Sequence, residues 1–116
     1  MEEIKVGEYI RTRGIIGKLA RIEYDRIDTS LKWYVLDRGN HEVTYVNKPY
    51  IEKYSFNILD LIEVGDIVTH AEGITFITAF ENEEVLEHFK KLYKNDVHLI
   101  KTILTKERYK ANCYEV

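Results

Sequence analysis

The sequence predicts an α+β protein that is mostly antiparallel β: a small barrel or twisted sheet with one packed amphipathic helix. The main evidence is a pattern that occurs twice, in IKVGEYIRTRGI from Ile4 and in IEVGDIVTHAEGI from Ile62. Each copy reads as a glycine bend into a short strand, a second turn and a return strand. A helical period of apolar residues is clear in one place, at residues 82–95.

The two copies predict hairpins at 4–24 and 62–80. The second return strand, from Ile74, is rich in β-branched and aromatic residues, which favour a half-buried pleated strand. In the first return strand, Gly17 marks a bulge or a place where the strand passes close to its neighbour. Because both hairpins open in the same way, we expect both to contribute to one barrel, which would leave no open sheet edges.

The remaining segments complete a single domain, 1–116. Residues 31–47 predict a central hairpin around an Asp-Arg-Gly-Asn turn. The helix at 82–95 has Asn82 as its expected N-terminal cap, with acidic residues in its first turn and lysines in its last. We expect a strand and a short helix at 97–116, ending in an edge strand that contains Cys113.

Composition limits the class of protein. Apolar residues make up 45% of the 116 residues and charged residues 32%, which favours a folded chain with its own core. One cysteine excludes a disulfide framework and indicates a reducing, cytoplasmic setting. No apolar stretch approaches the length of a membrane span, and no charged leader precedes an apolar run. We therefore expect a cytoplasmic protein without a membrane partner.

The apolar, glycine and acidic positions of the first hairpin follow a definite order: Val6, Gly7, Glu8, Ile10, Gly14, Gly17, Leu19 and Ile22. This order resembles the opening hairpin of SH3-like barrels, including KOW-type modules. The resemblance implies a small SH3-like barrel, and KOW-type modules usually contact RNA or ribosomal and transcription partners. In this chain the basic loop of those modules is reduced to Arg11 and Arg13.

A second resemblance rests on further stretches of the chain. These are VGEYIRT from Val6, NILDLIEVGD from Asn57, and IKTILTKERY from Ile100 together with the terminal NCYEV. Taken whole, the chain resembles small proteins carried by phages and prophages of Gram-positive bacteria. That resemblance implies an accessory or host-takeover role. Its most specific form is an inhibitor of a bacterial defence protein, comparable to an anti-CRISPR protein.

The sequence offers little for catalysis or metal binding. The four histidines are scattered, and none stands in an H-x-x-x-H or H-E-x-x-H pair. The acidic residues Asp25, Asp28 and Asp37 lie in turn-like contexts, where aspartate serves the backbone. No glycine-rich run has the spacing of a phosphate-binding loop. We expect no enzyme activity, no catalytic residue, no metal and no cofactor.

Aromatic and basic residues interleave in the central hairpin and beyond it. Trp33 and Tyr34 are neighbours in a strand and must point to opposite faces, so one is expected in the core and the other outside. Exposed Tyr, Trp and Arg side chains carry much of the binding energy at protein interfaces. We therefore predict contact with a host protein partner through these residues: Arg11, Arg13, Trp33, Tyr34, Tyr45 and Tyr50.

Two alternatives stay open. The strand pair that carries Arg11, Arg13, Lys18 and Arg21 could bind nucleic acid, although the net charge is −3 and no segment is strongly basic. A concave pocket lined by Tyr and Arg would instead indicate a small ligand. The terminal CYEV could also pair across a two-fold axis and make a homodimer.

Overall fold

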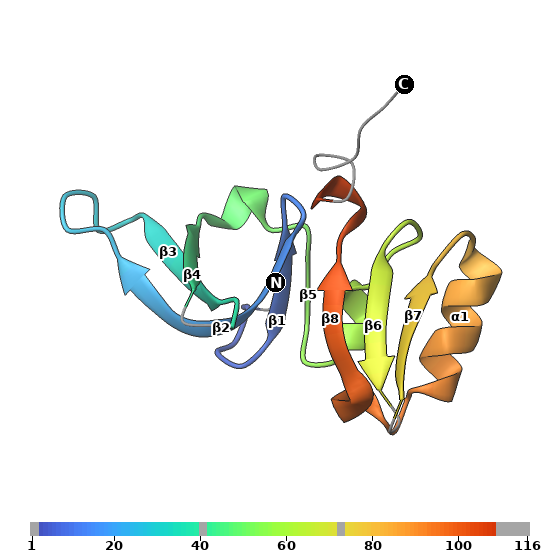
Figure 1. The fold of residues 1–116 in the computed structure, drawn as a ribbon. Coiled ribbons are helices and arrows are strands. Elements are labelled where there is room, and N and C mark those ends of the chain that lie inside the picture. The colour runs from blue at the N-terminus through green and yellow to red at the C-terminus, as the bar shows by residue number, and fades with distance from the viewer. Residues whose placement is uncertain (1–2, 40–41, 72–73, 109–116) are drawn as a thin grey trace. The chain divides into compact units, whose positions relative to one another are not determined.

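The computed structural model describes residues 3–39, 42–71 and 74–108. It confirms the predicted fold class, since the described residues are mostly antiparallel β, with two sheets and one ten-residue helix. The chain divides into two compact units, Met1–Leu61 and Ile62–Val116. Figure 1 shows the strands of each unit.

The first unit is a five-stranded antiparallel sheet with the order β4-β3-β2-β1-β5. Its elements are β1 (Tyr9–Thr12), β2 (Ile15–Tyr24), β3 (Lys32–Asp37), β4 (Val43–Val46), β5 (Lys53–Ser55) and the 3₁₀ turns η1 (Lys48–Tyr50) and η2 (Ile58–Leu61). The predicted hairpins at 4–24 and 31–47 are thus confirmed. Among the described residues β4 and β5 do not pair with each other, so the sheet is open and no barrel closes.

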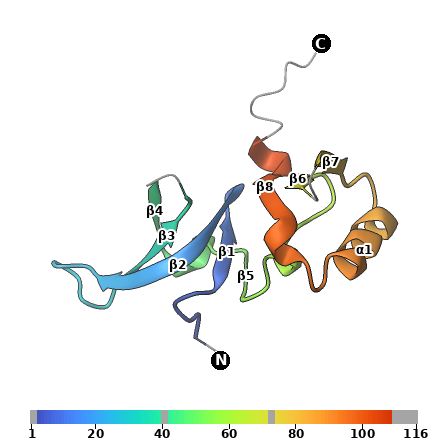
Figure 2. The ribbon, with the colours of Figure 1, turned by 60° about the horizontal axis from the view of Figure 1, so that its bottom comes forward.

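The longest strand, β2, pairs with β1 along its first half and with β3 along its second half (Figure 2). The close approach expected at Gly17 is confirmed, because a Cβ there would lie 2.9 Å from the Cβ of Leu36. The irregularity in register falls slightly later, between Leu19 and Arg21. Gly17 is therefore required by packing, while the bulge shifts the strand just beyond it.

One face of this sheet builds the core of the first unit. The core side chains come from β1 to β4 and from the segment before β1: Ile4, Ile10, Leu19, Tyr34, Leu36 and Val46. They alternate with residues on the outer face, as the two-residue period of a strand requires. The opposite face of the β2–β3–β4 meander carries Trp33, Val35 and Tyr45, of which Val35 is fully buried.

The second unit is a three-stranded antiparallel sheet, with the order β7-β6-β8, and a helix. Its elements are β6 (Ile67–Ala71), β7 (Thr75–Ala79), α1 (Glu83–Leu92), the 3₁₀ turn η3 (Val97–Leu99) and β8 (Ile100–Leu104). The hairpin at 62–80 is confirmed. The strand expected from Val97 begins at Ile100, after η3. Residues 109–116, where an edge strand was expected, lie outside the described residues.

Helix α1 starts as predicted, since Asn82 Oδ1 accepts a hydrogen bond from the amide of Val85 at 2.9 Å. Its buried side chains, Leu86 and Phe89, are followed by the buried Tyr93. The ring of Phe89 packs edge-on against Phe80, with centroids 5.0 Å apart. The apolar stripe therefore covers one face of the second sheet, although Val85 and Leu92 stay partly exposed.

The repeated sequence pattern forms the same turn twice. In Lys5–Glu8 and in Glu63–Asp66, the fourth amide donates to the first carbonyl at 3.0 and 3.1 Å. The glycines have φ angles of 99° and 98°, which L side chains rarely adopt. The acidic side chain then accepts from the first amide at 2.8 Å in both copies. The pattern thus specifies a turn with an acidic cap.

The two repeated hairpins do not share a sheet. The first forms β1 and β2 of the five-stranded sheet, whereas the second forms β6 and β7 of the three-stranded sheet. The expectation that both contribute to one barrel is wrong. The shared turn fixes how each hairpin begins, but strand order depends on longer-range pairing that the turn does not encode.

Candidate functional site

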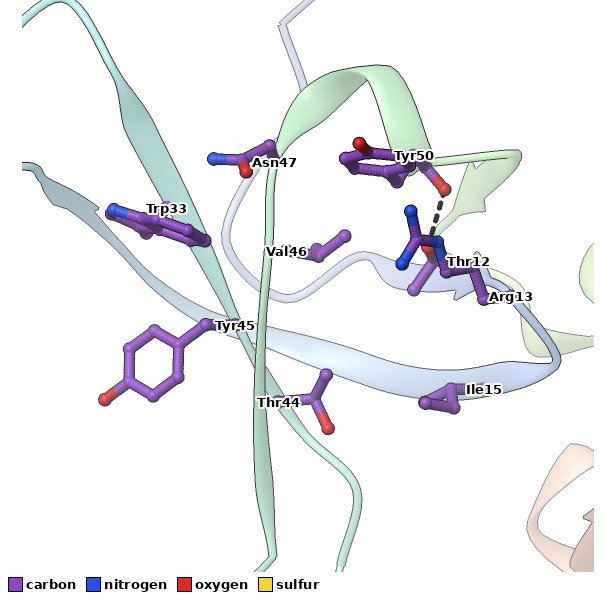
Figure 3. Close-up of a pocket in the computed structure, with 9 residues that line it drawn as sticks. All are labelled: Thr12, Arg13, Ile15, Trp33, Thr44, Tyr45, Val46, Asn47 and Tyr50. Carbon is purple, nitrogen blue, oxygen red and sulfur yellow. Dashed lines mark hydrogen bonds between the residues drawn. The ribbon is translucent and has the colours of Figure 1, made fainter.

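A pocket on the first unit gathers four of the six predicted contact residues. Arg13, Trp33, Tyr45 and Tyr50 all line this pocket, whose volume is about 300 Å³. We call it the Trp33 pocket. The other lining residues are Thr12, Ile15, Thr44, Val46 and Asn47. Figure 3 shows that the side chains come from the β1–β2 turn, β3, β4 and η1. In Figure 3, Trp33 and Tyr45 lie on one side of β4, and Arg13 and Tyr50 lie on the other. The fold therefore brings aromatic side chains that are distant in sequence to the two sides of β4.

The other two predicted contact residues are buried. Tyr34 is 2% exposed in the core, opposite Ile22 and Val46, so the expectation of one inward and one outward ring in the Trp33-Tyr34 pair is confirmed. Arg11 is fully buried, and its Nη1 donates to the carbonyl of Leu61 at 2.9 Å. We exclude Arg11 and Tyr34 from the candidate surface, because neither offers atoms to a partner in this conformation.

On one side of the pocket, Arg13 lies over the ring of Tyr50, with its guanidinium carbon 3.8 Å from the ring centroid. This is cation–π geometry. A hydrogen bond also joins the end of β1 to η1, since Thr12 Oγ1 donates to the carbonyl of Tyr50 at 2.5 Å (Figure 3). The amide of Arg13 donates to Glu52 Oε1 at 3.0 Å. Tyr50 is nevertheless 48% exposed, so part of its ring is available to a ligand.

On the other side, the half-buried indole of Trp33 is oriented by a carboxylate. Its Nε1 donates to Asp25 Oδ2 at 3.2 Å, and Asp25 Oδ1 accepts from the amides of Ile27 and Asp28. The amides of Asp28 and Ile27, and then the indole, lower the pKa of Asp25 below its usual value. The loop before β3 thus holds the indole in a defined direction.

A second hollow of about 340 Å³ adjoins the Trp33 pocket, and Trp33 and Tyr45 line both. The remaining lining residues of this second hollow are Glu23, Tyr24, Asp25 and Arg26. Beside it, Arg21 Nε contacts Glu23 Oε1 at 2.6 Å, which raises the pKa of the guanidinium. Arg21 Nη2 also lies 3.5 Å from the hydroxyl of Tyr45. Trp33 and Tyr45 therefore connect the two hollows, and charged groups lie at the margin of the second.

The basic residues proposed for nucleic-acid binding do not form a continuous positive strip. Arg11 is buried, and Arg21 is paired with Glu23. Lys18 lies 5.9 Å from the ring centroid of Tyr9 and opposite Asp37 in the β2–β3 register. Arg13 is the one member of this set that lines the Trp33 pocket.

Tyr24, Asp25 and Asn47 are site residues that the sequence analysis did not identify. Asp25 is the turn residue that the sequence predicts, and its side chain also binds the indole of Trp33. Asn47 lines the pocket and donates from Nδ2 to the carbonyl of Lys32 at 3.1 Å. The hairpin itself could have indicated the contact of Asp25 with Trp33, because the pairing of Glu23 with Trp33 places residue 25 diagonally across from residue 33.

Two other findings concern the parts of the chain that the structure describes. In residues 3–39, 42–71 and 74–108, no three His, Cys, Asp or Glu side chains gather to hold a metal ion. Within the same ranges, no helix is long and apolar enough to cross a membrane.

Comparison with protein-family models, curated proteins and solved structures found no match.

Proposed function

We propose that this protein is a non-enzymatic binding module that contacts a protein partner through the Trp33 pocket and the hollow beside it. One observation carries the proposal: Trp33, Tyr45 and Tyr50, which are separate in sequence, line a single pocket together with Arg13. Tyr45 and Tyr50 are each about half exposed, at 49% and 48%. Tyr, Trp and Arg are the residues most enriched among those that dominate interface energies.

The arrangement favours binding because its side chains are already held in place. Stacking of Arg13 on Tyr50 and the hydrogen bond from Trp33 to Asp25 restrict three long side chains before any partner arrives. Ordering a long side chain on binding costs about 0.5–1.5 kcal/mol, so a preformed surface loses less free energy on association. Steric occlusion of the partner's surface requires no cofactor.

The sequence resemblances narrow the kind of partner. The strand order β4-β3-β2-β1-β5, with a 3₁₀ turn before β5, is similar to the connectivity of SH3-like barrels, many of which are binding modules. The likeness to phage and prophage proteins of Gram-positive bacteria favours a host protein. In its most specific form, the protein is a cytoplasmic inhibitor that covers a surface of a bacterial defence protein.

The proposal is tested by site-specific photo-crosslinking in lysate of a Gram-positive host. A photoreactive phenylalanine derivative at position 45 should crosslink one host protein, identified by mass spectrometry. The same group at position 54 is the matched control, because Tyr54 is 41% exposed in the same unit but does not line either hollow. Position 54 should not yield that product.

Affinity for the identified protein should then be measured with two variants. Tyr50→Ala should weaken binding by about tenfold or more, whereas Tyr54→Ala should leave it nearly unchanged. Equal losses in both variants, or equal crosslinking from both positions, would contradict the proposed surface. If the crosslinked species is RNA or DNA instead of protein, the nucleic-acid alternative replaces the proposal.

A further inference from the structure

Strand β7 has an open edge. The order of the second sheet is β7-β6-β8, so β7 pairs with β6 on one side and with no described strand on the other (Figure 1). An open edge presents backbone N–H and C=O groups that can pair with a further strand. The kind of strand that fits this edge can be argued from the side chains of β7.

Charged side chains and proline, which normally discourage edge pairing, are missing from β7. Residues 74–80 read ITFITAF and contain neither a charged residue nor a proline. Its register with β6 is regular over five residue pairs, whereas the register of β6 with β8 is irregular. The edge strands β8 and β5 carry Lys101 and Lys53, and β4, with four residues, follows Glu42. Charges, irregular register and short length all discourage strand addition.

Apolar side chains on both faces of this edge are exposed to solvent. Ile74 is 70% exposed, Phe76 46% and Ile77 74%. Phe76 points to the helix side, where its ring stacks on His70 with centroids 5.6 Å apart. Ile77 alternates with it and points to the opposite face. A neighbouring strand would therefore cover apolar surface on both faces, as well as pairing the backbone.

We propose that β7 pairs antiparallel with β7 of a second copy of this chain, joining two three-stranded sheets into one of six strands. An uncharged strand meets itself without like-charge repulsion, and an antiparallel arrangement keeps Glu81 and the partner's Glu81 at opposite ends of the pair. A two-fold axis at Ile77 would place Ile77 opposite the partner's Ile77 and Thr75 opposite the partner's Ala79. A single strand thus supplies both halves of a closed, symmetric interface.

The antiparallel arrangement also fixes the side of the sheet on which the two helices would lie. Residues directly opposite each other in an antiparallel pair point to the same face. Both α1 helices would consequently cover the same side of the six-stranded sheet, with Phe76 of each copy under the joined helical layer. Pairing of this kind depends on protein concentration, because the dimer forms by mass action.

The test is sedimentation equilibrium of the full chain over a range of concentrations. The wild-type protein should approach twice the monomer mass of 13.8 kDa. Ile77→Lys should raise the dissociation constant by about a hundredfold or more, because it places two lysines opposite each other. Ile27→Lys is the matched control, since Ile27 is also an exposed isoleucine, 97% exposed, and lies in the first unit. This control should dimerise like the wild type.

Hydrogen exchange of the wild-type chain supplies a readout that does not depend on any variant. Amides of residues 75–79 should exchange more slowly as concentration and dimer fraction rise. A wild-type chain that stays monomeric at millimolar concentration, a dimer unaffected by Ile77→Lys, or an open series of larger oligomers would overturn the proposal. So would a monomeric full chain that dimerises after truncation at Arg108, because residues 109–116 would then be the occupant of this edge.

Discussion

At the scale of single residues, the carboxylate of Asp25 has two roles, one in the local turn and one in orienting Trp33. Its Oδ1 accepts the amides of Ile27 and Asp28 and so closes the loop between β2 and β3, while Oδ2 orients the indole of Trp33. The same carboxylate therefore links the local turn to the candidate binding surface. Replacing or protonating it should loosen both together.

The lowered pKa of Asp25 gives this link a pH dependence. A carboxylate with a depressed pKa in the folded state adds stability that is present above its unfolded value, near 3.8, and is lost as the pH falls through the folded pKa. Trp33 is the chain's one tryptophan, so its fluorescence reports the environment of this carboxylate. We expect an acid transition of the Trp33 emission with a midpoint below 3.8. The variant Asp25→Asn should lack this transition.

A control separates this effect from general acid unfolding. Asp37, the last residue of β3, uses its Oδ1 to accept the amide of Gly39 at 2.8 Å and not to orient Trp33, so Asp37→Asn should keep the emission transition. A wild-type midpoint at or above 3.8, or an unchanged transition in Asp25→Asn, would contradict the assignment.

At the scale of elements, the two acid-capped turns have one geometry in different surroundings. Glu8 is partly exposed, and its carboxylate accepts the amide of Lys5. Asp66 is fully buried and accepts the amide of Glu63 with one oxygen and that of Lys106 with the other. The second turn therefore also holds the segment after β8, through the amide of Lys106. The contact described for the Glu8 carboxylate stays within its own turn.

This difference predicts unequal costs for the same chemical change. In Asp66→Asn, an amide NH₂ group must face one of two partly buried backbone N–H groups, which should lower the free energy of unfolding by about 1–3 kcal/mol. In Glu8→Gln, the amide oxygen can still accept the Lys5 amide, so the change should stay within about 0.5 kcal/mol. Urea denaturation followed by circular dichroism measures both. Equal losses would show that the buried contacts of Asp66 contribute no extra stability.

Local pattern was sufficient for most elements. The helix start at Asn82, both glycine turns and the central hairpin follow from capping residues, turn residues and periodicity. The strand expected from Val97 starts later, at Ile100, because Val97–Leu99 form a 3₁₀ turn in which the amide of Leu99 donates to the carbonyl of Asp96. The close approach expected at Gly17 was correct, but the register irregularity lies beyond it and depends on the pairing of β2 with β3.

At the scale of the whole molecule, the charge distribution favours a protein partner over nucleic acid. The net charge is −3, and the proposed basic set is split between the buried Arg11 and the ion-paired Arg21. A protein that binds a phosphate backbone needs several available cations, and its affinity falls steeply with added salt.

We therefore expect a mixed-sequence single-stranded oligonucleotide to bind negligibly at physiological salt, as measured by fluorescence anisotropy. Lowering the salt should not produce tight binding, and Arg13→Ala should change the signal little. The opposite result is a salt slope equivalent to several phosphate contacts that decreases by about one contact in Arg13→Ala. It would favour the nucleic-acid alternative.

The sequence by itself determined the β-rich class, the two glycine turns and the helix, because each depends on neighbours within a few residues. It also determined that one ring of the Trp33-Tyr34 pair faces inward, since side chains alternate along a strand. Tertiary structure alone decided which ring that is, because the core face is set by pairing with Ile22 and Val46. Tertiary structure also decided that Arg11 is buried, because its guanidinium donates to the carbonyl of Leu61 in η2, a segment far along the chain.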